Sequence, residues 1–442
     1  MTRGLLLVAA SLAIVSGLLG TVEAQSKLVF AHYLIGTVDP ATNHAQLDID
    51  QAQAAGFDAF ALNIGAPSAS WALNTTDQLF DYADSVGFKL FFSFDLGQDG
   101  TLGDFDAIYT EYSDRDSYLH YGDSNLPLVS SYSGGSLGAS AWESFKTTYN
   151  VYLIPNPEAD GSYYSDPATF WGTWGSALDG VFSWETAWPK QSDSPVNVSA
   201  SQDQVVKSGA DAAGKAYMMG LSSLQYKHLD GSNWYRSGEG NFAQRMQQIL
   251  TVSPQFAEVI TWNDAGESHY IGNTWVEADI PDYGNSATTP HSGWQSVITS
   301  FIAAFKSGAT STSSMVPAGN AQFAGAMWYR PVLTSCVTQS GSDGTPPGYQ
   351  AGVDAVNYAV VLPADASGYT VKVSSAGTVI RTDTVGAGLS FNTVAGMVQG
   401  AQTLQLFNSS GDLVASASSS VDVGDSPVDG FCDFNYEVVG LS

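Results

Sequence analysis

Asp264 and Glu267 stand three residues apart, directly after an apolar run that predicts a β-strand. Enzymes that hydrolyse glycosidic bonds usually need two such carboxyl groups: one donates a proton to the leaving oxygen, and the other activates water or attacks the anomeric carbon. Asp95 and Glu185 follow two other predicted strands and are further candidates. Because the chain holds 43 acidic residues, the spacing alone also allows a structural role in which a carboxylate caps a turn.

Aromatic, amide and imidazole side chains accompany these acids at the ends of predicted strands. Aromatic rings stack on the C–H faces of sugars, while amides and carboxylates bind sugar hydroxyls. Each such side chain has core packing as its alternative role. His269 is also a candidate for orienting Glu267 and tuning its pKa. The candidate substrate contacts are His32, Tyr33, Asn63, Tyr132, Trp184, Glu185, Trp262, Asn263, His269 and Tyr270.

The elements that would position these side chains alternate along residues 27–300. Runs rich in β-branched and aromatic residues are continuously apolar, as parallel strands covered on both faces should be, and helix-like stretches separate them. The predicted strands are Lys27–Ile35, Phe57–Ile64, Lys89–Leu96, Leu126–Tyr132, Val151–Pro155, Gly180–Ala187, Ala216–Ser222 and Glu258–Asn263. The predicted helices are His44–Ala55, Thr76–Val86, Ala141–Thr148, Pro167–Leu178, Gln202–Ala213 and Asn241–Leu250.

Eight strand–helix units indicate an α/β fold, a (β/α)8 TIM barrel, with a doubly wound open sheet as the alternative. In a barrel, the side chains that do chemistry project from the C-terminal ends of the strands. We expect the catalytic barrel to span residues 25–306. The Ser-, Thr- and Gly-rich segment 307–320 predicts a linker. Short strand-like runs beyond it predict an all-β, sandwich-like accessory domain over residues 321–442.

The first 24 residues predict a secretory signal peptide. Arg3 precedes the apolar run Leu5–Leu19, and the small-residue cleavage motif Val22-Glu23-Ala24 follows. The run is too short and wrongly flanked for a membrane-spanning helix. We therefore expect a protein that is secreted, extracellular or held in a cell wall. Sequons in such a protein predict N-glycosylation. The candidate sites are Asn74, Asn197 and Asn408.

Cys336 and Cys432 are the two cysteines of the chain. In an oxidising compartment they predict one disulfide that closes a loop of 96 residues. The chain-entropy model assigns about 4.7 kcal/mol to a loop of this size. Neither the cysteines nor the six histidines show metal-ligand spacing, and no phosphate-binding glycine motif opens a helix. The sequence predicts no metal and no cofactor.

The net negative charge of the chain limits the classes of partner that it can bind. The chain has 15 basic and 43 acidic residues, a net charge of −28 and an isoelectric point near 4.1. Such a surface repels phosphate backbones and anionic lipid, so nucleic acid and membranes are excluded as partners. A neutral polysaccharide remains, and we expect a monomer to bind it.

The segment Gly134-Gly135-Ser136-Leu137-Gly138 matches the pattern of a serine-hydrolase elbow. Such an elbow should follow an apolar strand directly, whereas Ser130-Ser131-Tyr132-Ser133 intervenes here. We interpret the segment as a glycine-rich loop over the cleft. A serine esterase that uses Ser136 is the corresponding minor hypothesis.

Four segments resemble glycoside hydrolase family 71, the fungal endo-α-1,3-glucanases or mutanases. They are KLVFAHYLI at Lys27–Ile35, FDAFALNIG at Phe57–Gly65, FFSFDL at Phe91–Leu96 and, most specifically, ITWNDAGESHYIG at Ile260–Gly272. The similarity runs from about Lys27 to the C-terminus. The resemblance implies a (β/α)8 barrel with an accessory β-domain, hydrolysis of α-1,3-glucan with inversion of anomeric configuration, and essential acids at Asp95, Asp264 and Glu267.

The roles of these acids follow as hypotheses. We favour Glu267 as general acid and Asp264 as the base that positions water, with the reverse as the alternative. Asp95 either stabilises positive charge at the anomeric carbon or is itself the base. Inversion requires roughly 6.5–9.5 Å between the two carboxyl groups, so a much shorter separation of Asp264 and Glu267 would move the base to Asp95. A secreted wall-binding protein without catalysis is the competing function.

Overall fold

A curled sheet of parallel strands lies at the centre of the computed structural model, which describes residues 26–97, 100–229, 232–275, 289–338, 345–427 and 432–442. Seven parallel ladders join its strands in the order β6-β5-β3-β2-β1-β11-β8-β7. Seven of the eight strands lie where the sequence predicts them, and β11 begins two residues before its predicted run and overlaps it only at Glu258 and Val259. Their bounds are β1 Leu28–Leu34, β2 Ala59–Ile64, β3 Lys89–Asp95, β5 Leu126–Gly134, β6 Tyr152–Asn156, β7 Gly180–Ser183, β8 Ala216–Leu221 and β11 Phe256–Val259.

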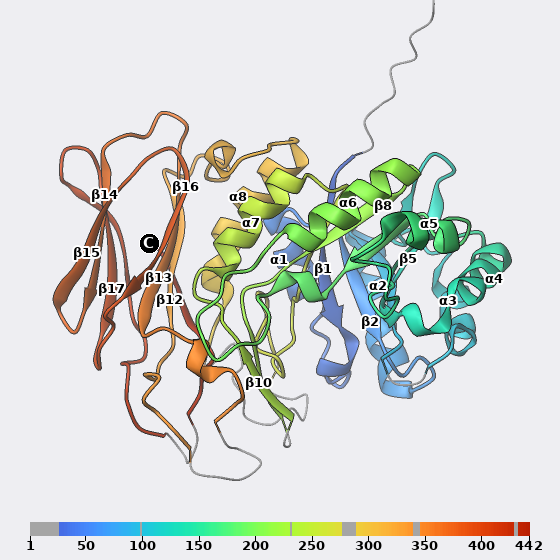
Figure 1. Cartoon of the computed structure of the whole chain (residues 1–442), viewed down its shortest axis with the longest axis horizontal. Helices are drawn as coiled ribbons and strands as arrows, with labels where there is room; N and C mark the ends of the chain where they lie inside the picture. The colour runs from blue at the N-terminus through green and yellow to red at the C-terminus, as the bar shows by residue number, and fades with distance from the viewer. Residues whose placement is uncertain (1–25, 98–99, 230–231, 276–288, 339–344, 428–431) are drawn as a thin grey trace, which may run out of the picture.

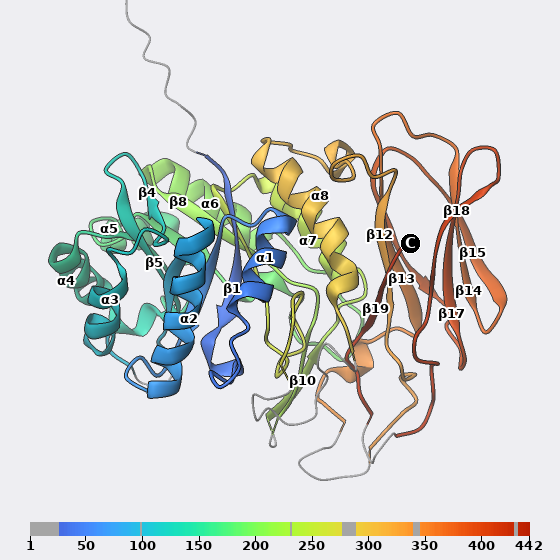
Figure 2. The ribbon, with the colours of Figure 1, turned by 180° about the vertical axis from the view of Figure 1, so that it is seen from behind.

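An α-helix follows each of these strands and covers the outside of the sheet (Figures 1 and 2). Helices therefore bury one face of each strand and the interior of the curled sheet buries the other, which is why every residue of β8 is buried. The sequence prediction omits α3 and α8. The bounds are α1 Ala45–Ala55, α2 Ser70–Val86, α3 Asp106–Tyr112, α4 Ala139–Tyr149, α5 Pro167–Trp174, α6 Ser201–Ala213, α7 Asn241–Val252 and α8 Gln295–Lys306.

Two predicted strands are shorter than expected. β7 ends at Ser183 because Glu185–Ala187 form a 3-10 helix, η4. β11 ends at Val259, where the chain turns into the segment that carries Asp264 and Glu267. In both cases the chain leaves the sheet earlier than the run of apolar residues suggests. The residues beyond the strand ends are thereby free to form loops at this edge.

A buried ion pair ties α6 and α7 to the sheet. Asp203 on α6 and Arg245 on α7 are both inaccessible to solvent, and their closest charged atoms lie 2.7 Å apart. Asp203 also accepts hydrogen bonds from Thr186 Oγ1 at 2.8 Å and Tyr217 OH at 2.7 Å. Arg245 donates to the carbonyl of Gly220 at 2.8 Å. The ion pair thus connects the helices α6 and α7 to each other, to β8 and to the segment after β7.

We expect Asp203→Ala to lower the free energy of unfolding by about 3–5 kcal/mol, because it leaves the buried guanidinium of Arg245 without its counter-charge. Urea denaturation of the purified protein measures this loss. Asp211→Ala is the matched control, since it breaks the exposed ion pair with Lys207 on the same helix. That variant should lose about 0.5 kcal/mol or less. Equal losses in the two variants would contradict the expectation.

A β-hairpin that the sequence prediction omits lies between β8 and α7. Its strands are β9 (Gln225–Leu229) and β10 (Ser232–Arg236), which pair antiparallel. Figure 1 shows β10 at the bottom of the view, at the end of the molecule opposite the start of β1. A second short addition, β4 (His120–Tyr121), pairs antiparallel with β5. The hairpin therefore stands at the edge where the parallel strands end.

The C-terminal part consists of two four-stranded antiparallel sheets, β16-β13-β12-β19 and β15-β14-β17-β18. Apolar residues of both sheets form one buried cluster between them. Five short runs predict strands in this part, and all are present, whereas β12, β16 and β19 are additional. The predicted runs are Tyr358–Leu362, Thr370–Val373, Thr378–Thr382, Thr403–Phe407 and Leu413–Ala417. The bounds are β12 Ala324–Tyr329, β13 Ala355–Leu362, β14 Tyr369–Ser375, β15 Thr378–Val385, β16 Gly388–Ala395, β17 Gln402–Phe407, β18 Leu413–Ser418 and β19 Glu437–Gly440.

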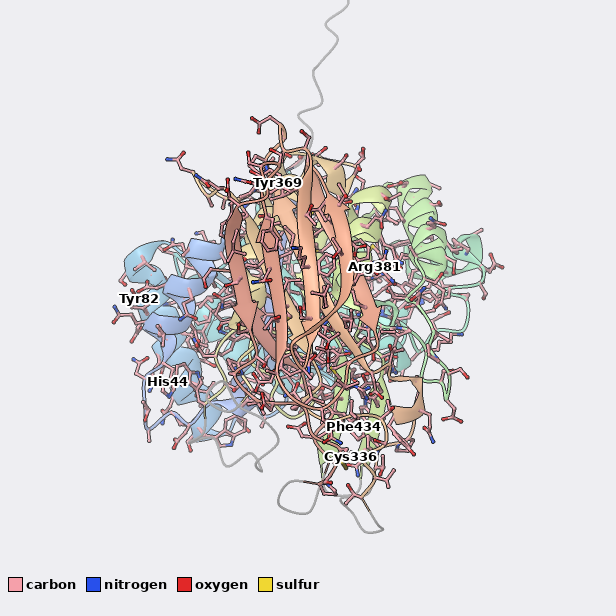
Figure 3. All side chains as sticks on the ribbon, turned by 90° about the vertical axis from the view of Figure 1, so that its left-hand side faces the viewer. His44, Tyr82, Cys336, Tyr369, Arg381 and Phe434 are labelled. Atoms are coloured by element: carbon pink, nitrogen blue, oxygen red, sulfur yellow. A yellow bond between two sulfur atoms is a disulfide. The ribbon has the colours of Figure 1, made fainter. Side chains whose placement is uncertain are left out.

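The inner sheet packs directly on the helical part of the molecule. Trp328 of β12 lies 5.8 Å from Trp294, ring centre to ring centre, and its indole N–H donates to the carbonyl of Glu239 at 3.0 Å. Figure 3 looks onto the outer sheet, with Tyr369 and Arg381 on it and Cys336 and Phe434 below it. The predicted disulfide between Cys336 and Cys432 is confirmed, with an S–S distance of 2.04 Å. The two parts therefore share one continuous apolar core.

The segment 307–320 contains a short 3-10 helix, η6 (Thr312–Ser314), and buries Met315 completely. It therefore packs against the rest of the molecule along part of its length. The predicted signal peptide, residues 1–24, lies outside the described residues. Within the described part of the chain, every helix is too short or too polar to cross a membrane.

Candidate active site

A cavity of about 430 Å³ opens at the edge where the parallel strands end. Loops and strand ends from β1, β2, β3, β5, β7, β9 and β11 contribute to its wall. Polar and charged side chains from the strand ends and the loops after them therefore gather at this opening. The lining includes six of the residues that the sequence predicts: Asn63, Asp95, Tyr132, Trp184, Asp264 and Glu267.

Asp264 and Glu267 form the centre of the site together with His269. One carboxylate oxygen of each acid and a ring nitrogen of His269 lie within 4.8 Å of one another. His269 Nε2 is 3.3 Å from Glu267 Oε2 and 3.6 Å from Asp264 Oδ2. His269 Nε2 is thus within hydrogen-bond distance of Glu267 and faces Asp264 as a second, longer contact. His269 is buried, so it can hold both acids in place without itself meeting solvent.

The local backbone also fixes this pair. The backbone N–H of Glu267 donates to Asp264 Oδ1 at 3.0 Å, and the N–H of Asp264 donates to Thr261 Oγ1 at 2.9 Å. Ser268, between Glu267 and His269, has a positive φ of 61°. A non-glycine residue rarely adopts this left-handed conformation, which is concentrated at functional sites. The turn thus directs the three side chains toward one point.

The hairpin supplies two contacts that the sequence analysis missed. Gln225 Nε2 donates to Glu267 Oε2 at 2.5 Å, and Lys227 Nζ lies 3.3 Å from Glu267 Oε1. The Lys227 ammonium also stands over the ring of Trp234, 4.5 Å from its centre. Lys227 is therefore held between an aromatic face and the carboxylate, and it lines the cavity.

These contacts separate the pKa values of the two acids. Burial raises the pKa of Asp264, and the nearby Glu267 carboxylate raises it further, against an opposing effect of His269. Burial also acts to raise the pKa of Glu267. The hydrogen bond and charge of His269, the amide of Gln225 and the ammonium of Lys227 outweigh it and lower this pKa to about 2. Of the two acids, Asp264 is thus the one that holds a proton more readily, and Glu267 is the one that ionises more readily.

The separation of Asp264 and Glu267 is shorter than an inverting pair requires. Their nearest oxygens fall within 4.8 Å, against the roughly 6.5–9.5 Å that leaves room for a water molecule. Asp95 occupies a different part of the wall, at the end of β3, and β2 and β1 separate β3 from β11. Asp95 therefore lines the same cavity from a strand three positions away in the sheet.

Tyr132 and Trp184 form an aromatic wall. Their ring centres are 5.0 Å apart in an edge-on arrangement. Burial, with the carboxylates of Glu267, Glu185 and Asp95, raises the pKa of Tyr132 to about 12, so the phenol stays protonated and able to donate. His32 lies behind this wall, 4.8 Å from Trp184 between ring centres, and its Nδ1 is 2.6 Å from the buried Glu258 Oε1. These rings offer an apolar face beside the carboxylates.

Four predicted contacts lie behind the cavity wall. Tyr33 OH and Trp262 Nε1 both donate to the buried Asp48, at 2.9 and 3.0 Å. Asn263 Oδ1 accepts from the N–H of Leu34 at 2.8 Å, which joins the end of β1 to the Asp264 segment. Tyr270 stacks on His291 at 3.9 Å and accepts from Asn435 at 3.3 Å. Their hydrogen bonds fix the backbone around the acids.

Glu185 lies beside the cavity and not in it. Its carboxylate is half-exposed and pairs with Arg236 of the hairpin at 2.8 Å. Its backbone N–H donates to Glu158 Oε1 at 3.0 Å, and Glu158 also accepts from Asn156 at 2.8 Å. Burial raises the pKa of Glu158 to about 7. Glu158, which the sequence analysis did not single out, thereby holds the chain segment that presents Trp184.

The donor set of Asp264, Glu267 and His269 is the one cluster in the described residues that could hold a metal ion. However, an ammonium and an amide N–H already point at Glu267, and both would be displaced or repelled by a divalent cation. The arrangement fits proton transfer better. Ser136 lies in the 3-10 helix η3 (Gly135–Leu137), outside the cavity lining.

The three sequons differ in setting. Asn74 and Asn197 are exposed, the first on α2 and the second before α6. Asn408 is partly buried, and its side-chain oxygen accepts from the backbone N–H groups of Ser410 and Asp412 at 3.0 and 2.9 Å. Asn408 is therefore engaged in a turn of the folded chain.

Comparison with known proteins agrees with this geometry. The sequence model of glycosyl hydrolase family 71 matches residues 25–442. A mutanase of Penicillium rubens is 30% identical over 429 residues, which cover 94% of this chain and 88% of the relative. A glucan endo-1,3-alpha-glucosidase of Schizosaccharomyces pombe is 30% identical over 338 residues, covering 73% and 74%.

Among solved structures, the fold is similar to a family 99 endo-alpha-mannosidase from Bacteroides thetaiotaomicron. The TM-score is 0.51 at 12% sequence identity, over 64% of this chain and 99% of that one. At this identity the likeness concerns the fold alone. The sequence match over almost the whole length, together with the cluster of acids at the strand ends, shows that the chain is a glycoside hydrolase and belongs to glycosyl hydrolase family 71.

Proposed function

We propose that the protein hydrolyses internal α-1,3-glucosidic bonds of α-1,3-glucan, the polymer also called mutan or pseudonigeran, with inversion of anomeric configuration. The observation that carries the proposal is the meeting of Asp95, Asp264 and Glu267 in one cavity with an aromatic wall. The names of the relatives, a mutanase and a glucan endo-1,3-alpha-glucosidase, support the bond type. A neutral polymer also suits a chain of net charge −28.

The geometry changes the roles that the sequence favours. Asp264 is the general acid in this proposal, because its raised pKa keeps a proton available for the leaving oxygen. Asp95 is the general base, because it is the remaining carboxylate of the cavity wall and lies apart from the close pair. Glu267 remains ionised and stabilises the positive charge that develops at the anomeric carbon. Trp184 and Tyr132 bind the sugar face, and Asn63 binds a hydroxyl.

We also propose that the curled sheet closes into a (β/α)8 barrel through β6 and β7. Asp179, just before β7, donates its backbone N–H to the carbonyl of Leu153 in β6 at 3.0 Å. Its carboxylate accepts from the N–H of Leu153 at 2.9 Å. These bonds support contact between the two edge strands. The division into a catalytic barrel over 25–306, a connection over 307–320 and a β-sandwich over 321–442 is part of this proposal.

Secretion, N-glycosylation and a monomeric state complete the proposal. The disulfide supports an oxidising compartment. The exposed sequons Asn74 and Asn197 are the preferred glycan sites. Mass spectrometry of the secreted protein, before and after removal of N-glycans, checks both the signal cleavage after residue 24 and the occupancy of each sequon.

The test of function is the release of reducing ends from alkali-soluble α-1,3-glucan, with β-1,3-glucan and starch as control polymers. We expect cleavage of the α-1,3 polymer alone, with products that show an internal cutting pattern. Heat-inactivated protein is the blank. Binding to the polymer without release of reducing ends would instead support a non-catalytic polysaccharide-binding protein.

Lys227 provides a pH test of the site. Its ammonium stabilises the ionised forms of both Glu267 and Asp264, so Lys227→Met should raise both pKa values. Asp264 must be protonated in this proposal, so the basic limb of the kcat/KM profile should move to higher pH, by roughly one unit. Lys227→Arg retains the charge and should keep the wild-type profile. A lower kcat/KM with an unmoved basic limb would show that Lys227 acts only through packing.

A further inference from the structure

Three hollows follow one another along one side of the catalytic edge. Trp184 lines the catalytic cavity, and the next residue, Glu185, lines a second hollow of about 790 Å³. Ser201, at the start of α6, lines both this second hollow and a third of about 860 Å³. The second and third hollows therefore adjoin at Ser201, and the second begins at the residue next to Trp184 of the catalytic cavity.

The third hollow is a groove between α5 and α6, which lie side by side in Figures 1 and 2. Of its twelve described lining residues, Asp166 alone is charged. Both carboxylate oxygens of Asp166 are engaged by Thr169, whose N–H and Oγ1 donate at 3.1 and 2.7 Å at the start of α5. The groove is thus effectively neutral in a chain of net charge −28. It would neither attract nor repel a neutral ligand electrostatically.

Trp171 gives the groove an aromatic face. The ring is half-buried, and its centre lies 5.1 Å from that of Phe170. Opposite it, α6 presents small residues: a Cβ added to Gly209 would lie 2.4 Å from Pro167 Cβ and 3.4 Å from Trp171 Nε1. The helices therefore approach closely at Gly209, while Gln204 and Ser208 stand exposed beside the ring. An aromatic face next to amide and hydroxyl groups matches the surface of a sugar.

The second hollow, like the groove, is lined by aromatic and polar side chains. Trp188, whose ring centre is 6.0 Å from that of Trp184, and Tyr164 contribute aromatic atoms to it. The charged pair Glu185–Arg236 closes on itself at 2.8 Å, and Lys190 is the other charged residue of this lining. A polymer strand that leaves the catalytic cavity past Trp184 would meet aromatic and polar groups along this hollow.

We infer that the groove between α5 and α6, with Trp171 as its platform, binds a distant stretch of the same neutral glucan strand whose bond lies at the acids. This inference rests on the proposed function for the identity of the polymer. The groove adjoins the second hollow at Ser201, and that hollow begins one residue from Trp184, so the inferred strand would run from the acids past Glu185 and Ser201 to Trp171. The groove thereby raises the affinity for long chains over short ones.

Filling the groove tests this inference. Ser208→Arg places a long side chain beside Trp171 without removing any packing, and Trp171→Ala removes the platform. We expect each to lower kcat/KM on long α-1,3-glucan, and its binding in a pelleting assay, by about tenfold. The loss should be confined to the polymer, since the inference places only the distant part of a long strand in the groove, whereas an α-1,3-oligosaccharide of four units is cleaved in the catalytic cavity. Gln247→Arg, at an exposed position on α7, is the matched control and should leave both substrates unaffected.

The outcomes separate the two proposals. Unchanged polymer hydrolysis and pelleting in both groove variants would overturn the inference while the proposed function stands. A wild-type protein that cleaves neither substrate would overturn the proposed function, and pelleting of the wild type against Ser208→Arg would still test the groove.

Light scattering tests whether a second copy of the chain occupies the groove instead. A wild-type dimer that Ser208→Arg dissociates would show that it does, and would overturn the inference.

Discussion

Asp264→Asn is expected to lower kcat on α-1,3-glucan about 10³-fold while the protein still binds the polymer, because the amide has no proton of comparable acidity to give to the leaving oxygen. The raised pKa of Asp264 is the basis of this expectation: burial and the ionised Glu267 beside it favour the protonated acid. The asparagine is nearly isosteric, so the hydrogen bond from the N–H of Glu267 at 3.0 Å should persist through its carbonyl oxygen.

A substrate with a better leaving group distinguishes this role from a structural one. An α-glucosyl fluoride needs little protonation of its leaving atom, so Asp264→Asn should recover most of its rate on that substrate. Glu267→Gln is the matched comparison from the same segment, and it should stay impaired on both substrates. If Glu267→Gln recovers and Asp264→Asn does not, the roles of the two acids are reversed.

The fold follows closely from patterns that short-range physics can explain. A strand covered by helices on one face and by the sheet interior on the other must be apolar throughout, so runs such as Ala216–Leu221 are visible in the sequence. The α8 helix is less visible, since the strand–helix rhythm before it is interrupted by the long segment after β11. In the C-terminal part, β16 has mostly half-buried residues, and its pattern gives little contrast between faces.

The β9–β10 hairpin has a recognisable pattern in the sequence. Two short runs, Gln225–Leu229 and Ser232–Arg236, flank Asp230-Gly231, a dipeptide that strongly favours a tight β-turn. Recognising it would have placed Lys227 near the end of β8. Its contact with Glu267 would still have been unknown, because that contact depends on how the hairpin folds back over the strand ends.

The buried aromatic residues show a further limit. Trp262 and Tyr270 belong to the same segment as the acids, so sequence position alone suggests that they face the ligand. Their partners, Asp48 and Asn435, lie 214 and 165 residues away in the chain. Only the tertiary structure reveals that these polar atoms are already satisfied behind the cavity. The separation of Asp264 and Glu267 is likewise a property of the turn at Ser268, which spacing in the sequence does not give.

Asp95→Asn should lower kcat on α-1,3-glucan by about 10³-fold or more, and it should not recover on the α-glucosyl fluoride. The base activates water whatever the leaving group is, so the loss should be the same on both substrates. Asp95 accepts from the N–H of Gly97 at 3.0 Å and lies at the end of β3, so an isosteric amide should leave the loop in place. An equal loss of kcat on both substrates would distinguish Asp95 as the general base from Asp264 as the general acid.

The anomeric configuration of the first product distinguishes a reaction in which Asp95 activates water from one that uses only Asp264 and Glu267. If Asp95 activates water, NMR of the early products must show the β-anomer from an α-linked polymer. Asp264 and Glu267, whose nearest oxygens lie within 4.8 Å, have instead the short separation that is typical of a retaining pair. An α-anomer as first product, with Asp95→Asn still active on the fluoride, would therefore assign the reaction to these two acids and make Asp95 a residue that binds the sugar.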